Sequence, residues 1–230
     1  FWALFIHAQD AQEIAEDPEQ QQDVWNDLRD LRQLFRATPW KQGQTSLRHV
    51  PPLEDSLLDY YTRGTYDAYW DRVEHNYTRY WDQHADIPVT LSTGWYDPFP
   101  TADTEYFMAM AESNSAPARL IVGPWSHVGM RGDATYCLDV DFGAASAWGV
   151  KRYFDEQLEF FNRWLPDGAT GQPAAEAPVR IFVMGGGSGR KTAEGKLDHG
   201  GRWREEWEWP LARRVETAFY LHGDGSLVTT

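Results

Sequence analysis

Residues 87–97, IPVTLSTGWYD, decide the fold, because a short β-branched apolar run ends at Gly94 and an acidic residue, Asp97, follows three positions later. Such a run, bounded by a glycine, is typical of a buried strand. A second run of the same kind, residues 118–122 with the sequence ARLIV, stops at Gly123. The sequence therefore predicts two buried strands, each followed at once by a loop.

Helical patterns follow both predicted strands, over residues 101–113 and over residues 146–165. The second pattern places Val150, Phe154 and Leu158 four residues apart, which is the spacing of an apolar helix face. Strands that are apolar throughout and alternate with helices are typical of a parallel sheet covered on both faces. We therefore expect an α/β fold.

The segments on either side of this unit differ in character. Residues 16–35 predict an amphipathic helix with Asp17 as its N-cap before Pro18. Helical patterns return over residues 57–61 and 66–81, so that the first eighty residues are predicted to be mostly helical.

After a linker over residues 166–178, rich in Pro, Gly and Ala, the helical period disappears. Residues 179–184 and 216–221 predict strands between Gly-rich and Trp-rich turns. This part of the chain predicts the opening of an all-β domain.

Composition narrows the class of protein. The 230 residues have a formal net charge of -14 and a pI of 4.8, which disfavours binding to nucleic acid or to anionic membrane surfaces. With Cys137 as the one cysteine, no internal disulfide is expected and the cytoplasm is the default location. No apolar run approaches the roughly 18 residues of a membrane span. The chain opens without Met inside the apolar run of residues 1–6, and we expect it to be a piece of a longer protein.

Aromatic residues make up 15% of the chain, including 12 Trp. Aromatic, apolar pockets suit acyl or aryl groups better than phosphates. The same residues allow a second hypothesis, a non-catalytic module that binds carbohydrate or protein through Trp203, Trp207 and Trp209.

Two residues at the predicted strand ends can do chemistry. Asp97 and His127 each lie just beyond a strand, and open parallel sheets place reactive groups at the carboxyl ends of their strands. Hydrolases of the α/β type need Ser, then Asp or Glu, then His in chain order. The order and placement fit this pattern, although a turn-forming aspartate and an ordinary loop histidine fit equally well on the pattern alone.

The nucleophile of such a triad is not evident. A nucleophile elbow has the form Gly-x-Ser-x-Gly, and no serine of the chain has glycine both two residues before and two residues after it. Ser188 comes nearest but has Arg190 at the last place, and it follows His127. We therefore expect the serine to lie upstream of Phe1.

The histidines show no metal-ligand spacing, so neither a metal nor another cofactor is expected.

The chain resembles the cocaine esterase and X-Pro dipeptidyl peptidase family of serine hydrolases. The resemblance covers most of the sequence and is weakest before about residue 60. The residues that support it are TYDAYW (65–70), IPV (87–89), GWYD (94–97), RLIVGPWSH (119–127), DFG (141–143), FF (160–161), WL (164–165) and VRIFVMG (179–185), with residues 207–210.

This resemblance implies an α/β-hydrolase domain, here a partial parallel sheet, with part of a helical cap and the start of a C-terminal β jelly-roll. Residues 1–72 would be the later part of the cap, 73–166 the end of the hydrolase domain and 178–230 the beginning of the jelly-roll. By position in the motifs, Asp97 and His127 correspond to the triad acid and base.

The resemblance also places Phe99 in the acyl pocket and implies a small-molecule ester or amide substrate, with an acyl-enzyme mechanism. Because the nucleophile is missing, the isolated chain is expected to be inactive. A sheet without its central strands exposes apolar faces and backbone edges, which favour aggregation, and association into a homo-oligomer is left open.

Overall fold

The computed structural model describes residues 16–127, 129, 132–165 and 176–229, together with Phe5, Ala11 and Ile14. The chain divides into two compact units, Phe1–Asn76 and Tyr77–Thr230. The boundary lies four residues from the expected junction between 1–72 and 73–166. The assignment of the parts as cap, hydrolase domain and jelly-roll stays a prediction.

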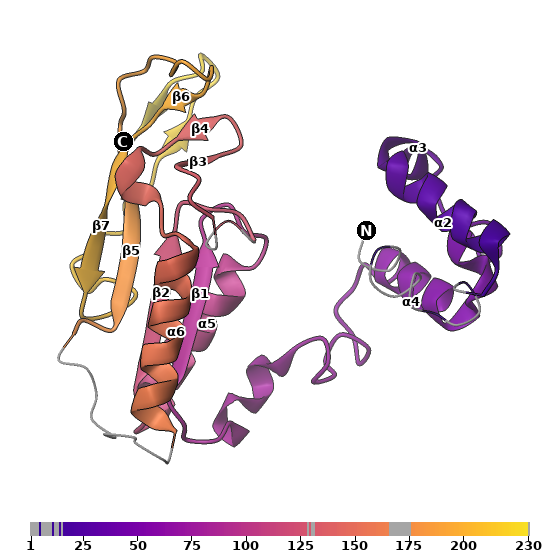
Figure 1. Cartoon of the computed structure of the whole chain (residues 1–230), viewed down its shortest axis with the longest axis horizontal. Helices are drawn as coiled ribbons and strands as arrows, with labels where there is room; N and C mark the ends of the chain where they lie inside the picture. Colours follow the sequence, from indigo (N-terminus) through magenta and orange to yellow (C-terminus); the bar gives the residue numbers. More distant parts are fainter. Residues whose placement is uncertain are drawn as a thin grey trace. The chain divides into compact units, whose positions relative to one another are not determined.

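The first unit is helical. It contains α2 (Pro18–Arg29), α3 (Leu31–Arg36), the short 3₁₀ helix η2 (Ser46–His49) and α4 (Pro51–Thr62) (Figure 1). Its apolar core contains four buried side chains, Val24 of α2, Leu47 of η2, and Ile14 and Val50 outside these elements. Partly buried leucines of the three α-helices pack around them: Leu28, Leu34, Leu53 and Leu57.

Capping explains where the first helices begin. The Asp17 carboxylate accepts the backbone N–H groups of Glu19 and Gln20, as expected for the N-cap. The single helix expected over residues 16–35 is wrong, because Asp30 ends α2 and its side chain accepts the N–H of Gln33 to start α3. A capping side chain in mid-sequence therefore divided the helix.

The helix expected over residues 66–81 is also wrong. Residues 65–76 form turns and bends, and a 3₁₀ helix, η3 (Tyr77–Gln83), follows in the second unit. Asp67 accepts the N–H of Tyr69, and the Trp70 indole donates to the carbonyl of Arg63. These local side-chain bonds compete with the helical ladder in spite of the helical spacing of the aromatic residues.

The second unit is built on a four-stranded sheet in the order β1 (Val89–Gly94), β2 (Ala118–Gly123), β5 (Val179–Met184) and β7 (Gly201–Glu206). Strands β1, β2 and β5 run parallel, and β7 runs antiparallel to β5. The strands predicted over residues 87–93, 118–122 and 179–184 are thus present, although the first begins at Val89. The strand predicted from residue 179 pairs with β2 in the same sheet.

Two long helices cover the sheet, α5 (Pro100–Ser113) and α6 (Val150–Trp164), close to the predicted ranges (Figure 1). On one face, Leu120 and Val122 pack with Phe107 of α5. On the other face, Ile121 packs with Trp148 and, at its edge, Tyr153 of α6. The alternation along β2 is what a strand buried on both faces requires, since successive side chains point to opposite sides.

Short elements complete the unit. A three-stranded sheet contains β3 (Tyr136–Cys137), β4 (Val140–Asp141) and β6 (Leu197–Asp198), and a 3₁₀ turn, η5 (Ala144–Ser146), precedes α6. A hairpin pairs β8 (Tyr220–Leu221) with β9 (Leu227–Val228). Of the strand expected over residues 216–221, only the last two residues are extended and paired. Most of the expected linker, residues 166–175, lies outside the described residues.

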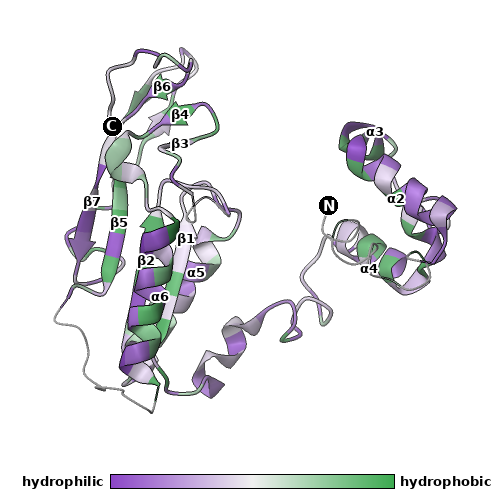
Figure 2. Cartoon of the chain, viewed as in Figure 1, coloured by the Kyte–Doolittle hydropathy of each residue, from purple (hydrophilic) through white to green (hydrophobic). Residues whose placement is uncertain are grey.

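One face of α6 is apolar and exposed. Side chains of Phe154, Leu158 and Phe161 are each about half exposed, and Figure 2 shows the hydrophobic residues interleaved with hydrophilic ones along the helix. At the sheet, β1 stands at one end of the strand order. Apolar side chains are therefore exposed on α6, while the expected exposure of the apolar faces of the sheet itself stays a prediction.

Candidate active site

The parallel register brings two strand ends together. Gly94 at the end of β1 lies opposite Gly123 at the end of β2. The two segments remain hydrogen-bonded at this point, because the N–H of Trp95 donates to the carbonyl of Gly123 at 2.9 Å. The loops that follow these strands, with Asp97 and His127, therefore leave the sheet side by side.

Asp97 is held in a tight turn. Its N–H donates to the carbonyl of Gly94 at 3.0 Å, and its Oδ1 accepts the N–H of Phe99 at 2.9 Å. The side chain is only 6% exposed. These contacts fix the carboxylate and leave Oδ2 directed toward the neighbouring loop.

His127 meets that oxygen. Its Nδ1 lies 3.0 Å from Asp97 Oδ2, and its side chain is 49% exposed. With the carboxylate ionised, Nδ1 carries the proton and donates, so that Nε2 of a neutral ring is the basic nitrogen. The structure thus brings together the two residues that the sequence singled out, in the arrangement that orients an imidazole as a general base.

The imidazole can be reached from a cleft. A cavity of about 490 Å³ has His127 in its wall, together with residues of β1, β2 and α6. Phe99 lies on another side of the ring, edge to face, with centroids 5.3 Å apart, and is 47% exposed. The ring therefore has space beside it for a reacting group, and an aromatic neighbour.

Sequence reasoning missed Asp103, in the first turn of α5. Burial raises the pKa of the Asp103 carboxyl above its ordinary value, and the charge of Asp97 raises it further, while the Thr93 hydroxyl and His127 act in the opposite direction. A second carboxyl thus lies within electrostatic reach of the pair. The sequence signal that could have pointed to Asp103 is its position at the start of the predicted helix that follows Asp97.

Ser188 lies elsewhere in the second unit. Its N–H donates to Asp198 and its hydroxyl accepts the N–H of Arg190, so that it stabilises the turn between β5 and β6. This agrees with its failure to match the nucleophile pattern.

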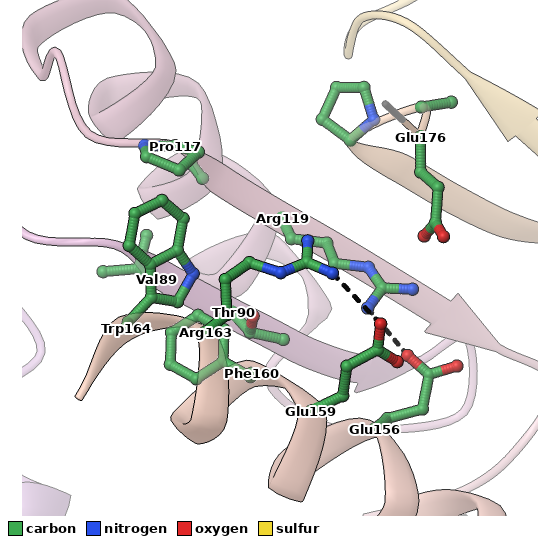
Figure 3. A pocket seen from close by; sticks show the side chains of 13 residues that line it. Val89, Thr90, Pro117, Arg119, Glu156, Glu159, Phe160, Arg163, Trp164 and Glu176 are labelled. Carbon is green, nitrogen blue, oxygen red and sulfur yellow. Dashed lines mark hydrogen bonds and ion pairs between the residues drawn. The ribbon is translucent and has the colours of Figure 1, made fainter. Parts of the chain in front are cut away.

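A second hollow, of about 200 Å³, lies where β1 and β2 begin (Figure 3). Its charged side chains point toward one another, as Arg119 pairs with Glu156 at 2.7 Å and Arg163 with Glu159 at 3.0 Å. Strands β1 and β2 begin here, whereas Asp97 lies beyond the end of β1. The Arg119–Glu156 pair joins α6 to the sheet and the Arg163–Glu159 pair lies within α6, so both pairs have a structural role.

Residues 3–129 match the family model of the X-Pro dipeptidyl-peptidase (S15 family), which is more than half of the 230-residue chain. The chain belongs to this family. The matched range includes both Asp97 and His127. The chain is also 35% identical over 205 residues to the cocaine esterase of Rhodococcus sp. (strain MB1 Bresler), which covers 88% of this chain and 31% of the relative. The family member described here thus spans about a third of the length of that relative.

Family membership agrees with the mixed α/β architecture and its parallel strands. Among the described residues, no helix is both long and apolar enough to cross a membrane.

Proposed function

We propose that this chain supplies the acid and the base of a Ser-His-Asp hydrolase that cleaves small-molecule esters or amides. The observation that supports the proposal is the contact between His127 Nδ1 and Asp97 Oδ2, at 3.0 Å and at the ends of adjacent parallel strands. Membership in the X-Pro dipeptidyl-peptidase family supports a hydrolase in general. The serine would come from sequence outside these 230 residues.

In the proposed mechanism, His127 Nε2 takes the proton of the serine hydroxyl as the oxygen attacks the substrate carbonyl carbon. The imidazolium then gives that proton to the leaving oxygen or nitrogen, and an acyl-enzyme forms. Water repeats the sequence, with His127 again as base, and releases the acid. Asp97 stays ionised throughout, because its role is to hold the Nδ1–H tautomer and to stabilise the cation.

Phe99 would contact the acyl group. Its ring is half exposed beside the imidazole, so that an apolar substituent of the substrate could pack on it while the carbonyl carbon lies near the base. The substrate class therefore remains an ester or amide with an apolar acyl side.

The test is hydrolysis of a p-nitrophenyl ester by the full-length protein that contains this chain. We expect Asp97→Asn and His127→Ala each to lower kcat by on the order of a thousandfold or more. Asp82→Asn and His222→Ala change the same residue types at exposed positions and should leave kcat within about twofold. Unchanged rates in the first two variants would refute the assignment.

The alternative, an aromatic binding module, receives little support from the three tryptophans that motivated it. Trp203 packs against both Trp125 and Trp148, and the ring centroids of Trp209 and Trp95 lie 6.2 Å apart. Trp207 is well exposed, at 73%. The three rings therefore do not form one exposed array.

A further inference from the structure

Trp125 lies two residues before His127 and contacts the loop of the acid directly. Its indole N–H donates to the carbonyl of Thr93 at 3.0 Å, and its own carbonyl accepts the N–H of Tyr96 at 3.2 Å. Thr93 and Tyr96 stand on either side of the β1 exit, and Tyr96 immediately precedes Asp97. Trp125, in the loop that carries His127, thus binds both the end of β1, at Thr93, and the loop that carries Asp97, at Tyr96.

The fit around Trp125 is tight. A Cβ atom at Gly94 would lie 1.9 Å from the Trp125 carbonyl oxygen, and one at Gly123 would lie 2.2 Å from its ring. Neither glycine has a positive φ, so both are required by space and not by backbone conformation. The tryptophan therefore occupies the room that these two strand ends leave.

The indole is also enclosed from the other side. Trp125 is 7% exposed, with Trp148 at 5.8 Å and Trp203 at 5.5 Å between ring centroids. These rings come from the segment before α6 and from β7. An indole that is held by several elements has one orientation, so that its N–H stays directed at the Thr93 carbonyl.

We propose that Trp125 is a positioning residue for the pair described above: its two hydrogen bonds hold the loops of β1 and β2 in the register that keeps Asp97 Oδ2 at bonding distance from His127 Nδ1. This inference rests on the proposed roles of Asp97 and His127. A displacement of about 1 Å in such a pair costs on the order of a hundredfold in rate. The loss of this one buried indole hydrogen bond is therefore expected to lower the rate of hydrolysis by more than its contribution to the free energy of unfolding would suggest.

The experiment uses Trp125→Phe in the full-length protein, because phenylalanine keeps an apolar ring and removes the N–H. We expect kcat for a p-nitrophenyl ester to fall about 10- to 100-fold, with KM changed less than about threefold. We also expect the low-field proton resonance of the His127 Nδ1–H to shift upfield and broaden, a readout that needs no catalysis.

Trp40→Phe is the matched control, because its partly buried indole N–H also donates to a backbone carbonyl, that of Leu34 at 3.0 Å, in the unit that contains neither Asp97 nor His127. It should lose similar stability, yet keep kcat within about twofold and the His127 resonance in place. A Trp125→Phe protein that folds with wild-type kcat and an unchanged resonance would overturn the inference. If Trp125→Phe fails to fold, β-(3-benzothienyl)alanine at position 125 preserves the shape without the donor, and the same two outcomes decide.

Failure of this inference and failure of the proposed function are distinct. Full activity in Asp97→Asn and His127→Ala would remove the function itself. Loss of activity in those two variants, together with wild-type behaviour in Trp125→Phe, would remove only the positioning role.

Discussion

At the residue scale, the pKa of a buried carboxyl group is shifted in opposite directions in the two units. Glu54 is 2% exposed, and burial alone would raise its pKa; yet hydrogen bonds from the Thr45 hydroxyl and from the N–H groups of Gly43 and Thr45, with Arg48 nearby, lower the pKa below its ordinary value. The pKa of Asp103 is raised, because burial and Asp97 outweigh its partners. The number of hydrogen-bond donors that reach each carboxylate decides the direction of its pKa shift.

Glu54→Gln tests this balance. Because the folded-state pKa of Glu54 is depressed, its contribution to stability is present above the unfolded pKa and is lost as pH falls through the folded value. We expect the substitution to lower the free energy of unfolding by about 1–3 kcal/mol at neutral pH and by less near pH 3. Urea unfolding followed by circular dichroism at both pH values measures the difference.

Glu74→Gln, exposed in the same unit, is the control and should change the free energy of unfolding by less than about 0.5 kcal/mol. An equal loss at both pH values would mean that the Glu54 carboxylate charge is not what matters.

At the element scale, α6 is attached to the sheet by both apolar and ionic contacts. Glu156 is 19% exposed and lies 2.7 Å from Arg119 of β2 and 3.2 Å from Arg180 of β5. Glu159, one turn further along the same helix, is 64% exposed and, within the described part of the chain, pairs with Arg163 alone. The same residue type thus serves as a partly buried link between elements and as a surface pair within one helix.

Glu156→Gln is expected to destabilise the protein by about 2 kcal/mol, since it removes the counter-charge that pairs with the partly buried Arg119 and leaves Arg180 with Glu205 as its acidic partner. Glu159→Gln should cost less than about 0.5 kcal/mol, as is usual for an exposed pair. Thermal unfolding of both variants at low and high salt measures the costs. Equal shifts in the two variants would contradict the proposed link.

At the scale of the whole molecule, two tendencies oppose each other. The net charge of -14 keeps copies of the chain apart, whereas the exposed apolar residues of α6 favour association. Leu158 is 60% exposed on that helix. Added salt shortens the range of the repulsion and leaves apolar attraction in place.

We therefore expect the 230-residue chain to associate as salt is raised, and Leu158→Glu to require about tenfold more protein for the same association, the equivalent of about 1.4 kcal/mol. Sedimentation velocity at moderate salt measures this. Gln157→Glu adds the same charge at the adjacent exposed position, and should have little effect. Equal effects of both variants would show that charge alone governs association.

The sequence by itself determined the features that depend on neighbouring residues. The cap at Asp17, the three buried strands, the helices α5 and α6 and the placement of Asp97 and His127 at strand ends follow from local pattern and chain order. Local competition also explains the failures, because Asp30 and Asp67 bind nearby N–H groups within stretches of helical spacing.

Only the tertiary structure decided which distant segments meet. Residues that are far apart in the chain meet in the pairing of β5 with β2, in the contacts of Glu156 with two arginines, and in the hydrogen bond from Trp125 to Thr93 of β1. Such contacts form when the sheet register is set, and many registers satisfy the same alternation of apolar residues. A pattern of one strand therefore specifies that it is buried, while its partners are chosen by the packing of the whole sheet.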